Sequence, residues 1–156
     1  MEGFVDFLIS YGNPGMFIAA LLSGSICPFI SSEAVMIALL AFGAEPWGLL
    51  VWASIGNIIG GIICYYLGCI GSPEWIQKAL RVNQEKMERA ALVADKHGAL
   101  AAFFGFVPLL GSAIIIVLGL MHADAPKTLI SMSAGKVLRY LIIVLPAIGI
   151  TWLIAH

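Results

Sequence analysis

The fold is decided by the stretch Ser23-Gly24-Ser25-Ile26-Cys27-Pro28-Phe29-Ile30-Ser31-Ser32-Glu33, which interrupts an apolar segment at its centre. The whole segment, Met16 to Phe42, is long enough to cross a membrane, but each flanking apolar piece has only about half that length at ~1.5 Å per residue. We therefore predict a re-entrant hairpin that turns at mid-depth and leaves on the face it entered. Irregular backbone at that depth must be buried in protein or face a water-filled cavity. The alternative is one spanning helix kinked at Pro28.

The same design recurs further along the chain. After Pro46, a clean apolar segment from Trp47 to Cys69 has full spanning length. A second interrupted segment covers Ala99 to Leu120, and the final apolar segment runs from Pro126 to the end. The second interruption is Gly105-Phe106-Val107-Pro108-Leu109-Leu110-Gly111-Ser112, in which we assign Pro108 and Gly111 to the hairpin turn, as we assign Pro28 in the first.

The two halves align with a shift of about 79 residues. Glu33 falls on Ser112, Ala44-Glu45 on Ala123-Asp124, and Asn57 on Lys136. Both halves also share the order of interrupted segment, acidic turn with proline, and long segment, which is typical of a duplicated transporter. We predict a single all-α integral membrane domain over 1–156, with repeat one at about 14–70, an amphipathic loop at about 71–98, and repeat two at about 99–156.

Composition and charge support a membrane location and give an orientation. The chain is 61% hydrophobic, with a mean hydropathy of +1.01. None of its 8 Lys and Arg residues precedes Lys78, and most of them lie in or beside the 71–98 loop, which predicts that this loop is cytoplasmic. A net charge of −1 argues against a nucleic-acid partner. Cys27, Cys64 and Cys69 have no spacing typical of a metal or redox site, so we expect buried thiols and no metal or cofactor.

Two topologies are compatible with this pattern. If both interrupted segments are hairpins, the two long helices cross in opposite directions and the repeats are inverted. Both termini and Glu45 then lie outside, with loop 71–98 and Lys127 inside. If all four segments are plain spans, the termini lie inside and Lys127 lies outside. The distribution of Lys and Arg favours the hairpins because no basic residue then flanks a segment on the outer face.

Together these residues resemble the DedA superfamily (SNARE-associated or VTT-domain membrane proteins), and specifically its small YqaA-like branch. The matching pieces are Pro28-Phe29-Ile30-Ser31-Ser32-Glu33-Ala34, Gly43-Ala44-Glu45-Pro46-Trp47, Gly56-Asn57-Ile58-Ile59-Gly60-Gly61, Phe106-Val107-Pro108-Leu109-Leu110-Gly111 and Gly135-Lys136-Val137-Leu138-Arg139-Tyr140. The resemblance implies facing re-entrant hairpins and movement of lipids between leaflets, including a polyprenyl-phosphate carrier in larger members and phospholipid scrambling in eukaryotic relatives. This chain departs from the family where related sequences carry an acid or arginine and it has Gly111-Ser112. A basic residue that is common near His122 is also missing.

Ionisable residues within apolar segments are the first functional candidates. A carboxylate at mid-bilayer costs about 2.5–3.5 kcal/mol on insertion scales, so Glu33 should pair, meet water or carry a proton. It would relay a proton or gate a head group; alternatively, it caps the half-helix that begins beside it, bonding the N–H groups near Ala34. Arg139 and Lys136 lie roughly 15 Å into the last helix and would bind a phosphate, or else they reach the interface as cytoplasmic anchors.

The remaining candidates are neutral polar residues. Asn57 would bind a ligand or form a hydrogen bond between helices. Ser31, Ser32 and Ser112 would bind a polar head group or satisfy the backbone at the two breaks.

The sequence therefore predicts a membrane transporter that moves an anionic lipid head group, polyprenyl-phosphate or phospholipid, between leaflets as a flippase or scramblase. Coupling to protons would use Glu33. The alternatives are a proton-coupled carrier of a small solute or cation, and a non-catalytic assembly factor for envelope biogenesis. No serine has a histidine and an acid at hydrolase spacing, so we expect no enzyme. Two full spans give thin lateral walls, which favours a homodimer. The family resemblance implies a bacterial inner membrane.

Overall fold

The computed structural model describes residues 10–25, 31–72, 84–107 and 110–155, and in these ranges the regular structure is entirely helical. The helices are α2 (Asn13–Gly24), α3 (Ser32–Ala41), α4 (Pro46–Ile70), α6 (Gln84–His97), the 3₁₀ helix η1 (Gly98–Phe106), α7 (Leu110–Leu120) and α8 (Ala125–Ala155). The all-α prediction is confirmed.

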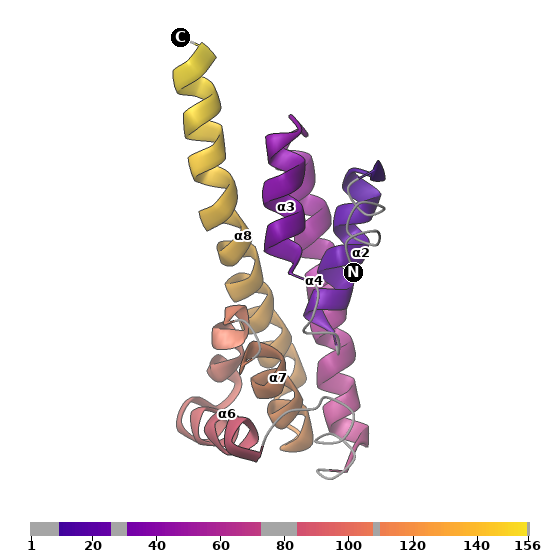
Figure 1. Cartoon of the computed structure of the whole chain (residues 1–156). Coiled ribbons are helices and arrows are strands. Elements are labelled where there is room, and N and C mark those ends of the chain that lie inside the picture. Colours follow the sequence, from indigo (N-terminus) through magenta and orange to yellow (C-terminus); the bar gives the residue numbers. More distant parts are fainter. Residues whose placement is uncertain (1–9, 26–30, 73–83, 108–109, 156) are drawn as a thin grey trace.

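Two long helices form the axis of the molecule. α4, and α8 from Ala125 to Pro146, are long and apolar enough to cross a membrane. They run in opposite directions, and α8 continues beyond the other helices to the C-terminus (Figure 1). The helix that begins at Pro46 starts as the sequence predicts, because Pro46 occupies the first turn and the Glu45 side chain caps the helix.

The first interrupted segment forms two short helices instead of one kinked helix. α2 descends beside α4, and α3 then rises in the same half of the molecule, so the chain reverses direction between them (Figure 1). The two helices meet near the reversal, where Ser32 Oγ donates a hydrogen bond to Ser23 Oγ at 3.3 Å. Pro28, predicted to make this turn, lies outside the described residues.

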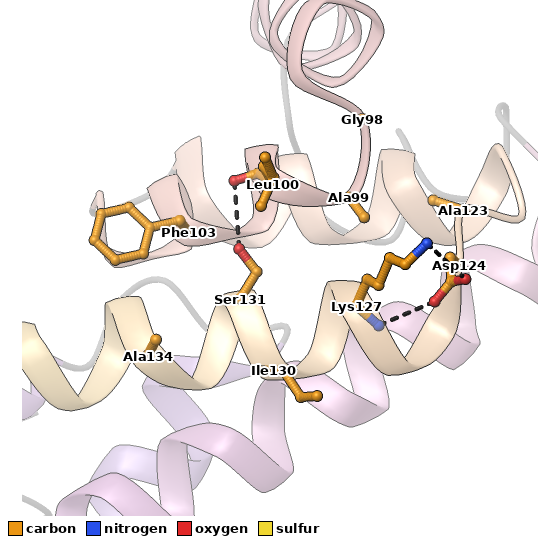
Figure 2. A pocket seen from close by; sticks show the side chains of 10 residues that line it. All are labelled: Gly98, Ala99, Leu100, Phe103, Ala123, Asp124, Lys127, Ile130, Ser131 and Ala134. Atoms are coloured by element: carbon orange, nitrogen blue, oxygen red, sulfur yellow. Dashed lines mark hydrogen bonds and ion pairs between the residues drawn. The ribbon is translucent and has the colours of Figure 1, made fainter.

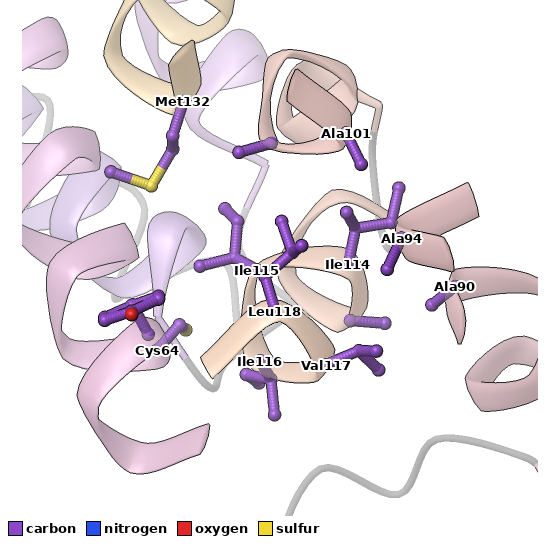
Figure 3. Close-up of a cluster of buried hydrophobic side chains, with 13 residues drawn as sticks. Cys64, Ala90, Ala94, Ala101, Ile114, Ile115, Ile116, Val117, Leu118 and Met132 are labelled. Atoms are coloured by element: carbon purple, nitrogen blue, oxygen red, sulfur yellow. The ribbon is translucent and has the colours of Figure 1, made fainter. Parts of the chain in front are cut away.

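The second interrupted segment packs in the other half of the molecule, together with α6 (Figure 1). Its first arm is the 3₁₀ helix η1 and its second arm is α7. The side chains of α7 fill the space between α6 and α4, as Figure 3 shows around Ile114 to Leu118. Pro108 lies outside the described residues, and Gly111 lies in the first turn of α7 against the Gly105 backbone.

α3 and α7 end in the same hydrogen-bonded turn. The Ala44 N–H donates to Leu39 O at 3.0 Å, and the Ala123 N–H makes the corresponding bond at 3.0 Å. Gly43 has a φ of 82°, and its counterpart His122 has a φ of 51°. Both residues are therefore in the left-handed conformation that this helix-ending motif requires. An acidic cap follows in both turns: Glu45 precedes α4 and Asp124 precedes α8. The same backbone geometry thus recurs at equivalent positions of the two halves, at the shift predicted from the sequence.

A long apolar stripe on α4 is exposed. It extends about 35 Å at ~1.5 Å per residue, which matches the hydrocarbon thickness of a bilayer. Soluble proteins rarely expose a patch of this size, so the stripe is the surface expected to contact lipid. Its residues are Trp47, Val51, Ile55, Ile59, Ile63, Tyr66 and Ile70.

Glycines on the long helices let the short helices approach closely. A Cβ on Gly56 would collide with the Phe17 carbonyl of α2, and a Cβ on Gly135 would collide with the Phe103 carbonyl of η1. Both contacts are with backbone, which cannot move aside as a flexible side chain can. Small residues at such positions let helices pack closely in a membrane.

We expect Gly135→Ala to destabilise the protein by about 1–3 kcal/mol, because the new methyl group forces α8 and η1 apart. Gly149→Ala is the matched control on the same helix, where a Cβ meets no atom within 4 Å. The control should be neutral or stabilising by up to ~1 kcal/mol. Thermal unfolding of the two purified variants measures the difference. Equal melting temperatures would contradict the packing of η1 on α8.

Candidate functional site

The first part of the site is an ion pair between α3 and α8. Ser31 caps α3, accepting a hydrogen bond from the Ala34 N–H at 3.3 Å, and donates from its hydroxyl to Glu33 Oε2 at 2.9 Å. Glu33 Oε1 pairs with Arg139 Nη2. The two side chains are 24% and 17% exposed, so the pair is shielded yet within reach of a ligand.

The second part is a buried lysine held by a neutral group. Lys136 of α8 is 3% exposed. Its Nζ donates to the Asn57 carbonyl at 2.6 Å and to Asn57 Oδ1 at 2.5 Å. No salt bridge involves Lys136 in the described part of the chain. A buried cation is costly without a counter-charge.

Two glycines provide the space for this contact. A Cβ on Gly61 would stand 2.8 Å from Lys136 Nζ, and a Cβ on Gly24 would stand 2.8 Å from Asn57 Oδ1. A methyl group at either position would displace the lysine or the amide. The close approach of α2, α4 and α8 therefore depends on the absence of side chains at these positions.

Tyr140 connects the two parts. Its hydroxyl lies 2.9 Å from Ser32 Oγ and accepts a hydrogen bond from Asn57 Nδ2 at 2.6 Å. Tyr140 and Ser32 are fully buried. A continuous set of polar contacts thus joins α3, α8 and α4, with Ser32 beside the ion pair at one end and Lys136 at the other. We call the residues Ser31, Ser32, Glu33, Asn57, Lys136, Arg139 and Tyr140 the polar network.

The ends of the interrupted helices add partial charges to the polar network. Glu33 lies in the first turn of α3, where the unpaired N–H groups favour a negative charge. Gly24 ends α2 and packs against Asn57, so the carbonyl end of α2 lies near the Lys136 ammonium. The break between α2 and α3 therefore favours an anion on one side and a cation on the other.

The polar network lies at mid-length along the spanning helices. Asn57 and Lys136 each lie about 16 Å from the start of their helix, at ~1.5 Å per residue. This is close to the centre of a bilayer of ~30 Å. At this level Lys136 contacts Asn57 and Arg139 pairs with Glu33.

The structure brings most of the predicted site residues together. Glu33, Arg139, Lys136, Asn57, Ser31 and Ser32 all belong to the polar network. Ser112 is half-buried on α7, at the position that Glu33 occupies in the first half. The cap of α3 is Ser31 and not Glu33, because the serine oxygen is the one that accepts the Ala34 N–H. Pro28 and Pro108 lie outside the described residues.

Tyr140 is the site residue that sequence reasoning missed. It ends the motif Gly135-Lys136-Val137-Leu138-Arg139-Tyr140, in which only the lysine and the arginine are predicted site residues. One signal was available: Tyr140 follows Lys136 by one helical turn, so both side chains lie on the same face of α8. A tyrosine on the face of an intramembrane lysine needs a partner for its hydroxyl.

The chemistry of the polar network suits an oxygen anion. Two cations, Lys136 and Arg139, are present with one carboxylate, Glu33, which leaves one excess positive charge. Arginine offers a forked pair of donors that fits phosphate or carboxylate. No cluster of His, Cys, Asp and Glu suited to a metal ion occurs within the described ranges.

Comparison with known proteins identifies the family. The profile of the VTT domain matches residues 27–148. The chain belongs to the VTT-domain family. The match includes the whole polar network, and it confirms the resemblance to the DedA superfamily stated above. No solved structure matches this VTT-domain protein.

Individual relatives agree with this assignment. The inner membrane protein YqaA of Escherichia coli is 27% identical over 139 residues, which cover 88% of this chain and 92% of YqaA. An uncharacterised protein of Haemophilus influenzae is 25% identical over 133 residues, or 80% of each chain. A Lactococcus lactis protein named alkaline phosphatase-like is 29% identical over 116 residues, covering 67% of this VTT-domain protein and 54% of the relative.

Proposed function

We propose that this VTT-domain protein consists of two inverted repeats, each a re-entrant hairpin followed by a spanning helix. The recurring turns at Gly43 and His122 support this arrangement. So does the contact between Lys136 and Asn57, which are 79 residues apart and equivalent in the two repeats. Near a two-fold axis a residue meets its own equivalent, and α4 and α8, which carry these two residues, run antiparallel (Figure 1).

On this framework, the proposed activity is transfer of an anionic lipid head group between leaflets. The observation that carries the proposal is the excess positive charge of the polar network at mid-depth, where Lys136 donates to the neutral Asn57 and forms no ion pair with a described residue. A phosphate on a polyprenyl or glycerol lipid would supply the missing negative charge. The head group would pass through the polar network while the tails stay in the bilayer.

The ion pair supplies a mechanism of exchange. In the resting state the Glu33 carboxylate pairs with Arg139 and takes the position in which a phosphate would bind. Protonation of Glu33 would release Arg139 to bind the phosphate, and loss of the proton would restore the pair and displace the lipid. The Ser31 hydroxyl, which now bonds Glu33, would hold the protonated carboxyl in place. Transport would then be coupled to protons, and no covalent bond would form or break.

The proposal includes a location and an assembly. The name of YqaA supports a bacterial inner membrane. The basic residues of α6 and its surroundings favour a cytoplasmic position for the 71–98 loop. Membrane lipids would be the partners, and a second copy of the chain would complete the lateral wall around the two spanning helices.

Reconstitution into liposomes tests this function. Liposomes carrying a short-chain polyprenyl phosphate or a phospholipid with a fluorescent acyl chain would report transfer between leaflets. We expect the wild-type protein to speed transfer at least tenfold over protein-free liposomes, without release of inorganic phosphate. Uptake of a small solute without lipid transfer would instead support the solute carrier. Absence of both activities would favour the assembly factor, and release of phosphate would contradict a non-enzymatic role.

A further inference from the structure

A groove lies apart from the polar network, between η1 and the first turns of α8. Its volume is about 730 Å³, within the range of sites for small molecules. The apolar walls include Leu100, Phe103, Ile130 and Ala134, whereas Asp124 and Lys127 lie at one end (Figure 2). Leu100 and Ile130 are 70% and 71% exposed, so the walls lack a cover among the described residues.

Comparison of the two halves shows why the groove is open. At the position of Ser131 the first half carries Trp52, which packs edge-on against Phe17 of α2 with ring centroids 6.0 Å apart. The smaller Ser131 reaches only across to the Leu100 carbonyl, to which its hydroxyl donates at 3.4 Å. Ala134 likewise replaces Ile55. The second half therefore lacks the aromatic ring that packs against the neighbouring short helix in the first.

We propose that this groove binds one chain of a membrane phospholipid whose head group carries both a phosphate and an ammonium. The wall residues Ile130 and Ala134 lie on the part of α8 that is long and apolar enough to cross a membrane, where lipid would be the solvent. At its polar end, Lys127 Nζ and Asp124 Oδ2 lie 3.6 Å apart and are 75% and 49% exposed. Such a pair matches a zwitterion: phosphate at Lys127 and ammonium at Asp124. This site is independent of the transport proposed above.

Native mass spectrometry of the whole protein, with phosphatidylethanolamine and phosphatidylglycerol added separately, tests the site. We expect phosphatidylethanolamine to be retained at least fivefold better. The double substitution Ser131→Trp with Ala134→Ile copies the first half and should reduce retention at least tenfold. Ile142→Trp is the matched control, since Ile142 is exposed on α8 outside the groove. The site would be overturned if Ile142→Trp reduced lipid retention as much as the double substitution, or if the double substitution did not reduce it.

Charge variants test the head group. Lys127→Gln and Asp124→Asn should each abolish the preference for phosphatidylethanolamine, and asparagine keeps the helix cap that Asp124 provides. A preference for phosphatidylglycerol in the wild-type protein would overturn the zwitterion assignment. Benzoylphenylalanine at position 130 identifies the occupant by photocrosslinking to it, and it does not fill the groove. A phospholipid adduct is expected, whereas a crosslink to a second copy or within the chain would overturn a lipid occupant.

Discussion

Glu33→Gln is expected to reduce lipid transfer at least a hundredfold and to lower the free energy of unfolding by about 1–3 kcal/mol. The substitution keeps the size of the side chain but leaves the Arg139 guanidinium, only 17% exposed, without its carboxylate. Breaking a fully buried pair costs ~3–5 kcal/mol, and partial exposure of this one lowers the cost. Transfer would fail because no titrating group remains to release and reclaim Arg139. Flipping rates in liposomes and chemical unfolding measure the two effects.

Controls separate the pair from a general loss of charge. The matched control is Glu85→Gln on α6, which breaks the Glu85–Arg89 pair at 68% and 69% exposure and should change neither quantity measurably. In a double-mutant cycle, Glu33→Gln with Arg139→Gln should be less destabilising than the sum of the single variants by about 1–2 kcal/mol. Additive effects, or a Glu33→Gln variant that transfers lipid at the wild-type rate, would contradict the exchange mechanism.

Asn57→Asp is expected to stabilise the protein and to impair its activity. The new carboxylate would lie within hydrogen-bond distance of Lys136 Nζ and supply a counter-charge, which no described residue gives to the buried ammonium. The Tyr140 hydroxyl, which accepts from the Asn57 amide in the wild type, can turn its proton to the carboxylate. Hydrogen bonds to charged groups contribute about 1.5–3 kcal/mol, so unfolding should require that much more free energy.

The same added stability would slow transport. Lys136 would have to leave a carboxylate before it could bind a phosphate, and each ~1.4 kcal/mol of extra cost is a factor of ten. We expect a tenfold to hundredfold decrease in flipping rate. Asn57→Leu is the comparison variant, because it removes the side-chain oxygen to which Lys136 donates and should lose both stability and activity. An Asn57→Asp protein that is less stable than the wild type would contradict a charged Lys136 in the polar network.

The sequence could predict which residues form the site because ionisable groups in a membrane are expensive. Glu33, Lys136 and Arg139 had few favourable places to lie other than a shared polar environment, and the structure brings them into one. The helix beginning at Pro46 was equally predictable, since a proline after an acidic cap starts a helix.

The pairings within the site could not be predicted from the sequence. Arg139 was expected to bind a phosphate, and Lys136 was not paired with Asn57, although the shift of 79 residues made them equivalent. Two helices can cross at many points along their length, and only their crossing point brings such equivalents into contact. The 3₁₀ form of η1 was not predicted either, because apolar residues from Gly98 to Phe106 fit an α-helix as well.

Inverted repeats are the central claim, and the accessibility of two equivalent positions tests it most directly. Phe42 and Met121 lie at the ends of α3 and α7 and are 78% and 48% exposed. Each would be replaced by cysteine in a protein whose native cysteines are substituted, and labelled in intact cells with an impermeant thiol reagent. Re-entrant, inverted repeats predict labelling of position 42 from outside and of position 121 only after the cells are opened. Labelling of both positions from outside would mean four plain spans, and the polar network would then not lie between facing hairpins.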